Sequence, residues 1–317
     1  MAGNETAATA ATPAPAAGSA TATSNGLLSM VGTPIGNLSD AAPRVVDTLA
    51  AADVVLCEDT RVTSKLLARF GIRVPLERCD ENVIASRVES VMGRLDAGER
   101  VAFVSDAGMP GVSDPGQRLV DAALDAGHKV EVIPGPSAVT CALVASGLPM
   151  EHFFFEGFLP RRAGEQCRRL RELALVPGAL VAYESPYRVA ATLANIAEVM
   201  PDRQVALVRE LTKVHEEVVR GAAPELAEYV AERDAIKGEC VVVIGAPEPD
   251  ELERRFAEMA RERGLGVDAP TSPDDAIREG LAAGEPKSKL AKRVAKAFGL
   301  DRAAAYDRVV ELSHEAE

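Results

Sequence analysis

Short apolar runs alternate with longer amphipathic stretches along the chain from residue 27 onward. The runs have the length of strands, and the stretches between them place apolar residues three and four positions apart, as a helix that covers a sheet does. This order is typical of parallel strands joined by crossover helices, so it predicts an α/β fold. The expected elements of the first part of the chain are strands at 27–31, 54–57, 101–105 and 130–133 and helices at 40–51 and 117–126.

A second set of apolar runs begins after Pro149. Its expected strands lie at 152–158, 180–183, 205–209, 217–219 and 240–244. The boundary between the two sets is expected near Gly147, which predicts one α/β domain at 26–146 and a second at 147–248.

The two ends of the chain depart from this pattern. Residues 1–25 are nearly all Ala, Thr, Pro, Gly and Ser, without the basic start and apolar core of a secretion signal, and they predict a disordered tail. Residues 249–286 predict a helix followed by a linker, because 264–286 are rich in Gly, Pro, Asp and Ser.

Residues 287–317 regain helical spacing and predict a small basic hairpin of two helices. Ser288 is expected to cap the first helix, Gly299 to end it and Asp301 to cap the second. The cations of this stretch are the densest in the sequence, so the hairpin is either an RNA-docking module or a basic element that packs on the body or on a second subunit.

Composition supports the fold class and narrows the function. Hydrophobic residues make up 47% of the 317 residues and aromatic residues 4%, which suits aliphatic α/β layers better than a disulfide scaffold. Five cysteines without CxxC spacing indicate a reducing cytoplasm, and no apolar run approaches the ~20 residues that cross a bilayer. The net charge of −13 argues against indiscriminate nucleic-acid binding, so any RNA contact must be local.

Three loops rich in small residues follow predicted strands of the first domain, at 32–37, 105–111 and 134–138. Ligands of open α/β sheets collect at the carboxyl ends of the strands, and small residues let backbone groups approach a ligand directly. One such loop alone would indicate only a turn. Three at one edge of a sheet predict a ligand site.

Several common sites do not fit these loops. The first loop lacks the spacing of a dinucleotide fingerprint, and none ends in the Lys-Ser/Thr of a P-loop. The four histidines are far apart and form no metal-ligand motif, so no metal is expected, and the Gly-x-Ser-x-Gly elbow of a hydrolase is missing.

In this order the loops resemble those of the tetrapyrrole-methylase superfamily of S-adenosylmethionine enzymes, and most closely its branch of ribosomal RNA small-subunit cytidine 2′-O-methyltransferases. The resemblance covers about residues 27–245. It is carried by the segments Gly32-Thr33-Pro34-Ile35-Gly36-Asn37-Leu38, Cys57-Glu58-Asp59-Thr60-Arg61, Ser105-Asp106-Ala107-Gly108, Glu156-Gly157-Phe158-Leu159-Pro160, Tyr183-Glu184-Ser185 and Arg209-Glu210-Leu211-Thr212-Lys213.

The resemblance implies two α/β domains with S-adenosylmethionine in the cleft between them, a homodimer, and 16S ribosomal RNA as the substrate, at cytidine C1402. Met109 and Cys240 depart from the residues expected in relatives, without changing the assignment. The residues that would line the cofactor, carried over by position, are Pro34, Ile35, Asp106, Ala107, Gly108, Gly111, Ser137, Ala138, Glu184 and Gly221.

Methyl transfer from a sulfonium needs alignment more than it needs a metal, and a nearby base can take the proton of the ribose hydroxyl. The candidates are Glu58, Asp59 and Lys213, with Arg61 as a phosphate-binding or orienting cation. The alternatives stay open: Asp59 or Thr60 can simply cap the following helix, and Lys213 can be a solvated cation.

A second basic cluster follows Pro160 and offers either phosphate contacts or a solvated helix face. It consists of Arg161, Arg162, Arg168, Arg169 and Arg171. Two rival functions remain at this point: a small-molecule methyltransferase of the same superfamily, and a non-catalytic RNA-binding protein in which the loops are only turns.

Overall fold

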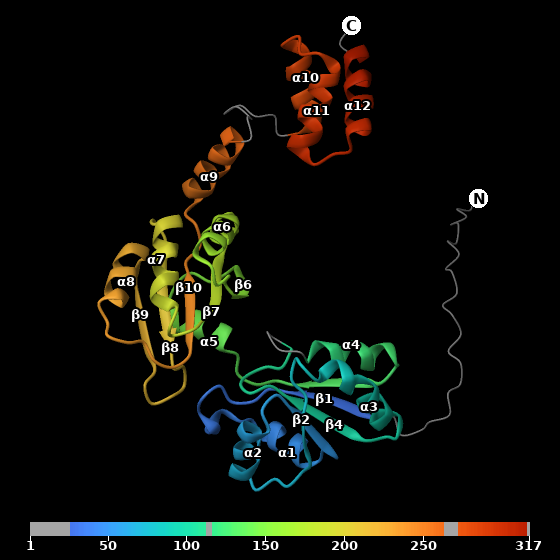
Figure 1. Cartoon of the computed structure of the whole chain (residues 1–317), viewed down its shortest axis with the longest axis vertical. Coiled ribbons are helices and arrows are strands. Elements are labelled where there is room, and N and C mark those ends of the chain that lie inside the picture. Colours follow the sequence, from blue (N-terminus) through green and yellow to red (C-terminus); the bar gives the residue numbers. More distant parts are fainter. Residues whose placement is uncertain (1–25, 112–115, 263–271, 316–317) are drawn as a thin grey trace, which may run out of the picture. The chain divides into compact units, whose positions relative to one another are not determined.

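The computed structural model describes residues 26–111, 116–262 and 272–315 (Figure 1). The chain divides into two compact units after Ser137. The predicted tail at 1–25 and part of the predicted linker lie outside the described residues.

The first unit is built on a parallel five-stranded sheet of order β3-β2-β4-β1-β5. The four predicted strands are confirmed to within one residue, and β3 is an addition. β3 has only three residues and none of them is fully buried, so it leaves no apolar run in the sequence. The strands are β1 (Leu27–Val31), β2 (Val54–Cys57), β3 (Leu76–Arg78), β4 (Arg100–Val104) and β5 (Lys129–Ile133).

Apolar side chains cover both faces of this sheet because successive residues of a strand point to opposite sides. Leu28, Leu56 and Phe103 pack on one face, and Val55 and Val104 on the other. Both faces are closed by amphipathic helices, as the alternating pattern predicts. The helices are α1 (Pro43–Ala50), α2 (Thr60–Arg69), α3 (Ile84–Asp96) and α4 (Gln117–Asp125), with a short 3-10 turn η1 (Leu38–Asp40) before α1.

The second unit contains a mixed sheet of order β6-β7-β10-β8-β9. β6 and β7 are parallel, whereas β10 runs antiparallel to both β7 and β8, and β9 antiparallel to β8. All five strands were predicted. They are β6 (Phe153–Phe158), β7 (Ala179–Glu184), β8 (Gln204–Arg209), β9 (Glu217–Ala222) and β10 (Cys240–Ile244).

Helix α5 (Ala138–Ser146) belongs to the second unit, whereas the sequence placed it in the first. It contacts four strands of the second sheet, and Arg220 of β9 donates hydrogen bonds to the carbonyls of Ser146 and Gly147 at its end. Three further helices of this unit lie against the sheet: α6 (Ala163–Leu173), α7 (Val189–Val199) and α8 (Ala223–Ala231). These three helices pack on one face of the sheet around a core that includes Leu170, Leu193 and Leu226.

Four helices end the chain: α9 (Pro249–Glu262), α10 (Pro273–Ala282), α11 (Lys287–Phe298) and α12 (Arg302–Glu315). The expected hairpin is present as α11 and α12, but α10 lies in what was predicted to be linker. Ile277 of α10 shares a core with Leu290, Val294 and Val309, so the last three helices form one three-helix unit. We call residues 272–315 the C-terminal module.

The caps of these helices correct and confirm the predicted boundaries. Ser272 caps α10 by accepting the Asp275 N–H at 3.1 Å. This helix start was not predicted, because the surrounding Gly, Pro, Asp and Ser residues are typical of a linker. Pro286, and not Ser288, precedes α11, which begins at Lys287 without a side-chain cap. Gly299 ends α11 in the left-handed conformation at φ +66°, and Asp301 caps α12, both as predicted.

Two general properties follow from the described residues. No helix in these ranges is both long and apolar enough to pass through a bilayer. All five cysteines are free thiols.

Candidate cofactor site and catalytic groups

The three loops of small residues meet at the carboxyl edge of the first sheet, because they follow the neighbouring strands β4, β1 and β5. Thr33 and Gly108 exchange two backbone hydrogen bonds, with N···O distances of 2.9 and 3.1 Å. The Thr33 hydroxyl also donates to the Ser105 carbonyl at 3.4 Å. The first and second loops are therefore one backbone-bonded structure.

The third loop lies against the first at two glycines. A Cβ added to Gly32 would lie 2.6 Å from the Gly135 nitrogen, and one added to Gly135 would lie 2.6 Å from the Gly32 carbonyl group. Only glycine fits at either position. The thioether of Met109, the predicted departure from the family, lies here and accepts the Gly135 N–H at 3.1 Å.

Some of the predicted cofactor residues on these loops are buried and pack between the loops, whereas others are exposed. Pro34, Ile35 and Gly108 are buried, and a Cβ on Gly108 would lie 3.2 Å from the Ile35 Cγ2 atom. Ala107 and Gly111 are exposed, and Gly108 and Gly111 have φ of +83° and +88°. Such angles favour glycine and turn the backbone of this loop sharply.

Asp106 of the second loop is exposed, Ser137 of the third loop is half-buried, and Ala138 is the first residue of α5. Residues 112–115 of the second loop lie outside the described residues. The structure thus brings Pro34, Ile35, Asp106, Ala107, Gly108, Gly111 and Ser137 together on the first unit.

The acidic candidates join the same edge through the loop after β2, the neighbour of β4. The Asp59 N–H donates to the Asp106 carboxylate at 3.0 Å, and the Asp106 N–H donates to the Glu58 carboxylate at 3.2 Å. Asp59 also caps α2 by accepting the Arg61 N–H at 2.8 Å. The capping role that the sequence left open for Asp59 is therefore real.

Arg61 is bound to Asp59 by its side chain as well, with Nη2 2.5 Å from a carboxylate oxygen, although 86% of the arginine side chain is exposed. These hydrogen bonds lower the pKa of Asp59 to about 2, so this carboxylate is a weak base at neutral pH. Partial desolvation raises the pKa of Asp106 instead. Asp59 therefore orients Arg61 better than it accepts a proton.

Lys213 lies in the second unit, in the loop between β8 and β9. Its ammonium donates to Glu210 at 2.8 Å and to Glu239 at 3.0 Å. Glu210 and Thr212 are the only non-glycine residues with positive φ in the described parts of the chain, at 52° and 64°. Such backbone strain persists only where surrounding contacts impose it, and it concentrates at functional sites.

These partners determine the charge of Lys213. Burial lowers its pKa, but the hydrogen bonds and charges of Glu210 and Glu239 outweigh that effect and raise the pKa above its ordinary value. Lys213 is thus a cation at neutral pH. As placed here, it fits a role in holding negative charge better than one as a proton acceptor.

Glu184 ends β7 and has a fully buried side chain. Its carboxylate accepts the Ser185 N–H at 2.7 Å, the Thr192 hydroxyl at 2.6 Å and an Arg188 N–H at 3.3 Å. Protein groups therefore occupy a carboxylate that the resemblance assigned to the cofactor.

The partners of Glu184 reach the segment after β6, which carries the Phe-Leu-Pro motif. Arg188 donates to the Leu159 and Pro160 carbonyls at 3.1 and 3.3 Å, and Gln166 donates to Pro160 at 3.1 Å. Gln166 also donates to the Thr192 hydroxyl at 3.2 Å. This network was not predicted from the sequence, although polar residues on the buried faces of α6 and α7 were its signal.

Gly221 does not share the sheet edge of Glu184. Glu184 lies opposite Cys240, which lies opposite Arg209, whereas Gly221 pairs with Val205 near the other end of β8. Four residues of strand separate Arg209 from Val205, which is about 13 Å. Within the second unit, the register separates two residues that the resemblance placed around one ligand.

The five arginines after Pro160 are mostly engaged. Arg169 donates two hydrogen bonds to Glu156, at 2.7 and 2.8 Å, and also pairs with a glutamate on its own helix. Arg162 and Arg171 form exposed ion pairs. The two cations of the cluster without a partner in the described part of the chain are Arg161 and Arg168.

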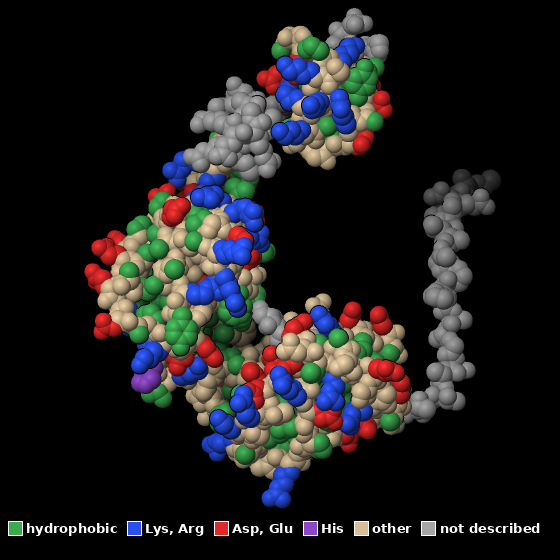
Figure 2. Space-filling view, in the orientation of Figure 1, with side chains coloured by type: hydrophobic (Ala, Val, Ile, Leu, Met, Phe, Trp, Pro, Cys, Tyr) green, Lys and Arg blue, Asp and Glu red, His purple; other side chains and the backbone are tan. Residues whose placement is uncertain are grey.

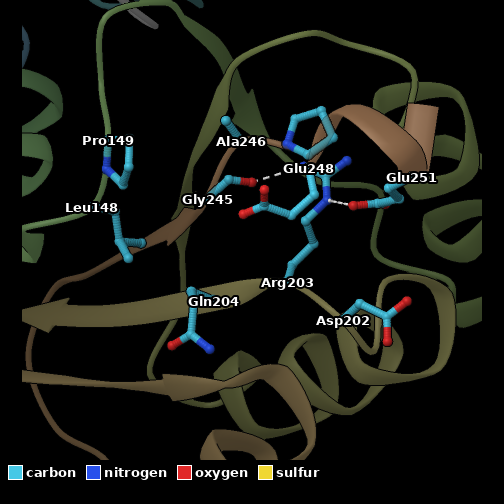
Figure 3. Close-up of a pocket in the computed structure, with 10 residues that line it drawn as sticks. Leu148, Pro149, Asp202, Arg203, Gln204, Gly245, Ala246, Glu248 and Glu251 are labelled. Carbon is cyan, nitrogen blue, oxygen red and sulfur yellow. Dashed lines mark hydrogen bonds and ion pairs between the residues drawn. The ribbon is translucent and has the colours of Figure 1, made fainter. Parts of the chain in front are cut away.

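A cavity of about 410 Å³ lies in the second unit, where β8 begins and β10 ends (Figure 3). Beside it the buried Arg203 donates to Glu251 at 2.6 Å and to the Gly245 and Ala174 carbonyls at 2.7 and 3.0 Å. Every terminal group of this arginine is thereby bonded. The arrangement anchors α9 and contains none of the predicted site residues.

Comparison with known proteins gives a consistent family. A family model described as Tetrapyrrole (Corrin/Porphyrin) Methylases matches residues 27–227. A Mesorhizobium japonicum protein named ribosomal RNA small subunit methyltransferase I is 43% identical over 291 residues, which cover 90% of this chain and 92% of the relative. A Mycobacterium bovis protein of the same name is 45% identical over 248 residues, which cover 77% of this chain and 86% of the relative.

Solved structures share the fold. The methyltransferase CobJ has a TM-score of 0.54 and 23% identity, and covers 70% of this chain and 94% of its own. A uroporphyrin-III C-methyltransferase from Thermus thermophilus, complexed with S-adenyl homocysteine, has a TM-score of 0.50 and 21% identity over 69% of this chain and 96% of its own.

Proposed function

We propose that this chain, which belongs to the tetrapyrrole methylase family and to its branch of ribosomal RNA small subunit methyltransferases I, transfers a methyl group from S-adenosylmethionine to a ribose 2′-hydroxyl of 16S ribosomal RNA. The specific target is cytidine C1402. The methyl donor follows from the family, and the ribosomal substrate from the names of relatives that match over most of their length.

The observation that carries this proposal is the convergence of the three loops of the first unit. Backbone hydrogen bonds join Thr33 to Gly108, and the Gly135 N–H of the third loop donates to the thioether of Met109 in the second. The exposed surface of the loops includes small residues such as Ala107 and Gly111. A flat, polar cofactor fits this chemistry, because backbone groups reach it without intervening side chains. The loops therefore fit S-adenosylmethionine in the region that the resemblance assigned to it.

The chain's main contribution to the reaction is positioning. S-adenosylmethionine, when bound, supplies a sulfonium methyl group that is already activated for displacement. The protein must hold the ribose oxygen in line with that methyl carbon and exclude competing geometries. Arg61, oriented by Asp59, and the cation Lys213 are suited to hold RNA phosphates during this alignment.

The proton of the 2′-hydroxyl leaves to a base or to water late in the transfer. Asp59 is a weak base because of its lowered pKa, and Lys213 is already protonated. Of the three candidates, Glu58 remains, bonded to the Asp106 backbone at the same sheet edge. We assign it the role of proton acceptor.

The test is methyl transfer from labelled S-adenosylmethionine to small ribosomal subunits that lack the modification, followed by nuclease mapping of the label. We expect label at one ribose, at C1402. Label on a tetrapyrrole and not on the subunit would instead identify a small-molecule methyltransferase, and no cofactor binding at all would leave only an RNA-binding protein.

Ala107→Trp tests the location of the cofactor. The exposed Ala107 lies between the buried Ser105 and Gly108, so a large side chain there fills the expected ligand space without disturbing the core. Calorimetry should show loss of S-adenosylmethionine binding at an unchanged melting temperature. Normal S-adenosylmethionine binding by this variant would mean that the cofactor site does not lie at these loops.

We further propose that the protein is a homodimer and that it lies in the cytoplasm. The edge strand β6 supports the dimer. β6 pairs only with β7 among the described strands and exposes Phe153, Phe154 and Phe158 by 48%, 39% and 60%. An apolar edge strand left open invites pairing with another chain. Sedimentation of Phe158→Asp, with Tyr229→Asp as an exposed aromatic control, should show dissociation for the first variant alone.

A further inference from the structure

Helix α11 has the sequence KSKLAKRVAKAF, with five basic residues and no acidic one. The whole protein carries 48 acidic against 35 basic residues, so this concentration is local. Figure 2 shows Lys and Arg side chains gathered on a face of the C-terminal module. The structure divides these cations into two kinds.

Some cations of the C-terminal module bind within the module. The Lys287 ammonium donates to the Ser313 hydroxyl at 2.7 Å. Arg293 donates twice to the Glu285 carboxylate, at 3.0 and 2.8 Å, and Arg308 of α12 is ion-paired as well. These side chains hold the helices and their connections together.

Lys289, Lys292 and Lys296 are different. All three are exposed, and within the described residues none has a hydrogen-bond or ion-pair partner. Their spacing of three and four residues puts them on one face of α11, opposite the buried Leu290 and Val294. They extend over about 10 Å of the helix, at 1.5 Å per residue.

This row of charges does not stabilise the free helix. Like charges three and four residues apart repel each other, and a cation in the first turn opposes the helix dipole. α11 has no carboxylate to offset either effect. A polyanionic partner offsets both, and screening keeps the acidic remainder of the protein from cancelling the attraction beyond about 8–10 Å.

We infer that Lys289, Lys292 and Lys296 form a stripe that binds phosphates of the RNA substrate and so docks the C-terminal module on the small ribosomal subunit. This inference rests on the proposed function, because that function supplies the RNA. Lysine ammonium groups contact phosphates as point charges without reading bases. The stripe therefore adds affinity and salt dependence but no sequence specificity.

The test measures binding of the full-length protein to unmodified small subunits over a range of salt concentrations, without methyl transfer. In the variant Lys289→Gln/Lys292→Gln/Lys296→Gln, three phosphate contacts are lost. We expect the slope of log K against log salt to fall by about 2 to 3, and the affinity at about 0.1 M salt to fall at least about tenfold. The Lys→Arg triple variant should bind as the wild type does.

A charge-matched control removes the same three positive charges elsewhere: Arg100→Gln, Lys129→Gln and Arg278→Gln. Arg100 and Lys129 begin β4 and β5, at the amino edge of the first sheet, and Arg278 is an exposed, ion-paired residue of α10. All the substituted side chains are exposed, so both triple variants should melt as the wild type does. Only the stripe variant should change the salt slope.

Unchanged affinity and slope in the stripe variant would overturn the inference, as would an equal loss in the charge-matched control. Competition by polyglutamate but not by a 16S RNA fragment would assign the stripe to an acidic protein and also overturn it. The protein could also bind the subunit through the stripe and yet transfer no methyl group to it. That result would refute the proposed function but leave the inference about the stripe intact.

Discussion

The carboxyl edge of the first sheet and the Glu184 edge of the second are built in different ways. In the first, backbone groups join the loops: Thr33 pairs with Gly108, and Gly32 lies against Gly135. In the second, side chains do so, through the buried Glu184 network and through the ion pairs of Glu210, Lys213 and Glu239.

The difference separates two tasks. Where backbone groups join the loops, side chains stay out of the ligand space, and no Cβ can be added at the points where the loops meet. Where side chains join the loops, the edge carries charged groups, and its structure depends on every hydrogen-bond and ion-pair partner in the network. We therefore expect steric substitutions to damage the first edge most, and charge or hydroxyl substitutions to damage the second.

The largest effect is expected for Gly135→Ala. The new Cβ would lie 2.6 Å from backbone atoms of Gly32, so the first and third loops must separate. We expect destabilisation of about 1–3 kcal/mol and loss of measurable S-adenosylmethionine binding by calorimetry. Gly93→Ala is the control, since Gly93 is inside α3 with no atom near its added Cβ. An unaffected Gly135→Ala would show that the loops are not rigidly joined.

Thr192→Val should follow in size. It keeps the shape of a side chain that is 1% exposed but leaves the Glu184 carboxylate without its 2.6 Å hydroxyl donor. A loss of about 1–3 kcal/mol in the free energy of unfolding is expected from denaturant titration. Thr192→Ser retains the hydroxyl and should recover most of it. A loss in Thr192→Ser without a loss in Thr192→Val would mean that packing of the methyl group, and not the hydrogen bond, matters.

Lys213→Gln tests whether this side chain acts as a cation. Removing the charge should lower the methyl-transfer rate on small subunits by about ten- to a hundredfold, with little effect on cofactor affinity. Because its neighbours raise the pKa of Lys213 above the usual 10.5, the wild-type rate should show no titration of this group between about pH 7 and 9. A rate that rises with loss of a proton from Lys213 would restore it as the base.

The smallest effect is expected for Asp59→Asn. The folded-state pKa of Asp59 is about 2, below the ordinary 3.8, so its contribution to stability is present above about pH 4 and is lost as the pH falls through 2. Because the pair with Arg61 is exposed, the variant should lower the melting temperature only slightly at pH 7, and the difference should vanish near pH 2. A large difference at pH 7 would contradict this.

Much of the fold could be predicted because its signals are local. Apolar runs marked nine of the ten described strands, Gly299 and Asp301 marked helix ends, and glycine placement marked the loops. β3 and α10 were missed because their own sequences are short or polar, and each forms against partners distant in the chain. The same reason placed α5 in the wrong unit: its apolar surface does not say which sheet it covers.

By itself, the sequence determined which residues could form strands, turns and a backbone-built ligand edge, because alternation and glycine act over a few neighbouring residues. Only the tertiary structure decided which charges are engaged. Lys213 meets Glu239 26 residues away, and Arg203 meets Glu251 48 residues away, whereas Lys289 remains unpaired within the described residues. Such pairings depend on the order of strands in a sheet and on helix packing. The fold therefore decides whether a basic residue is ion-paired within the protein or exposed to bind a partner.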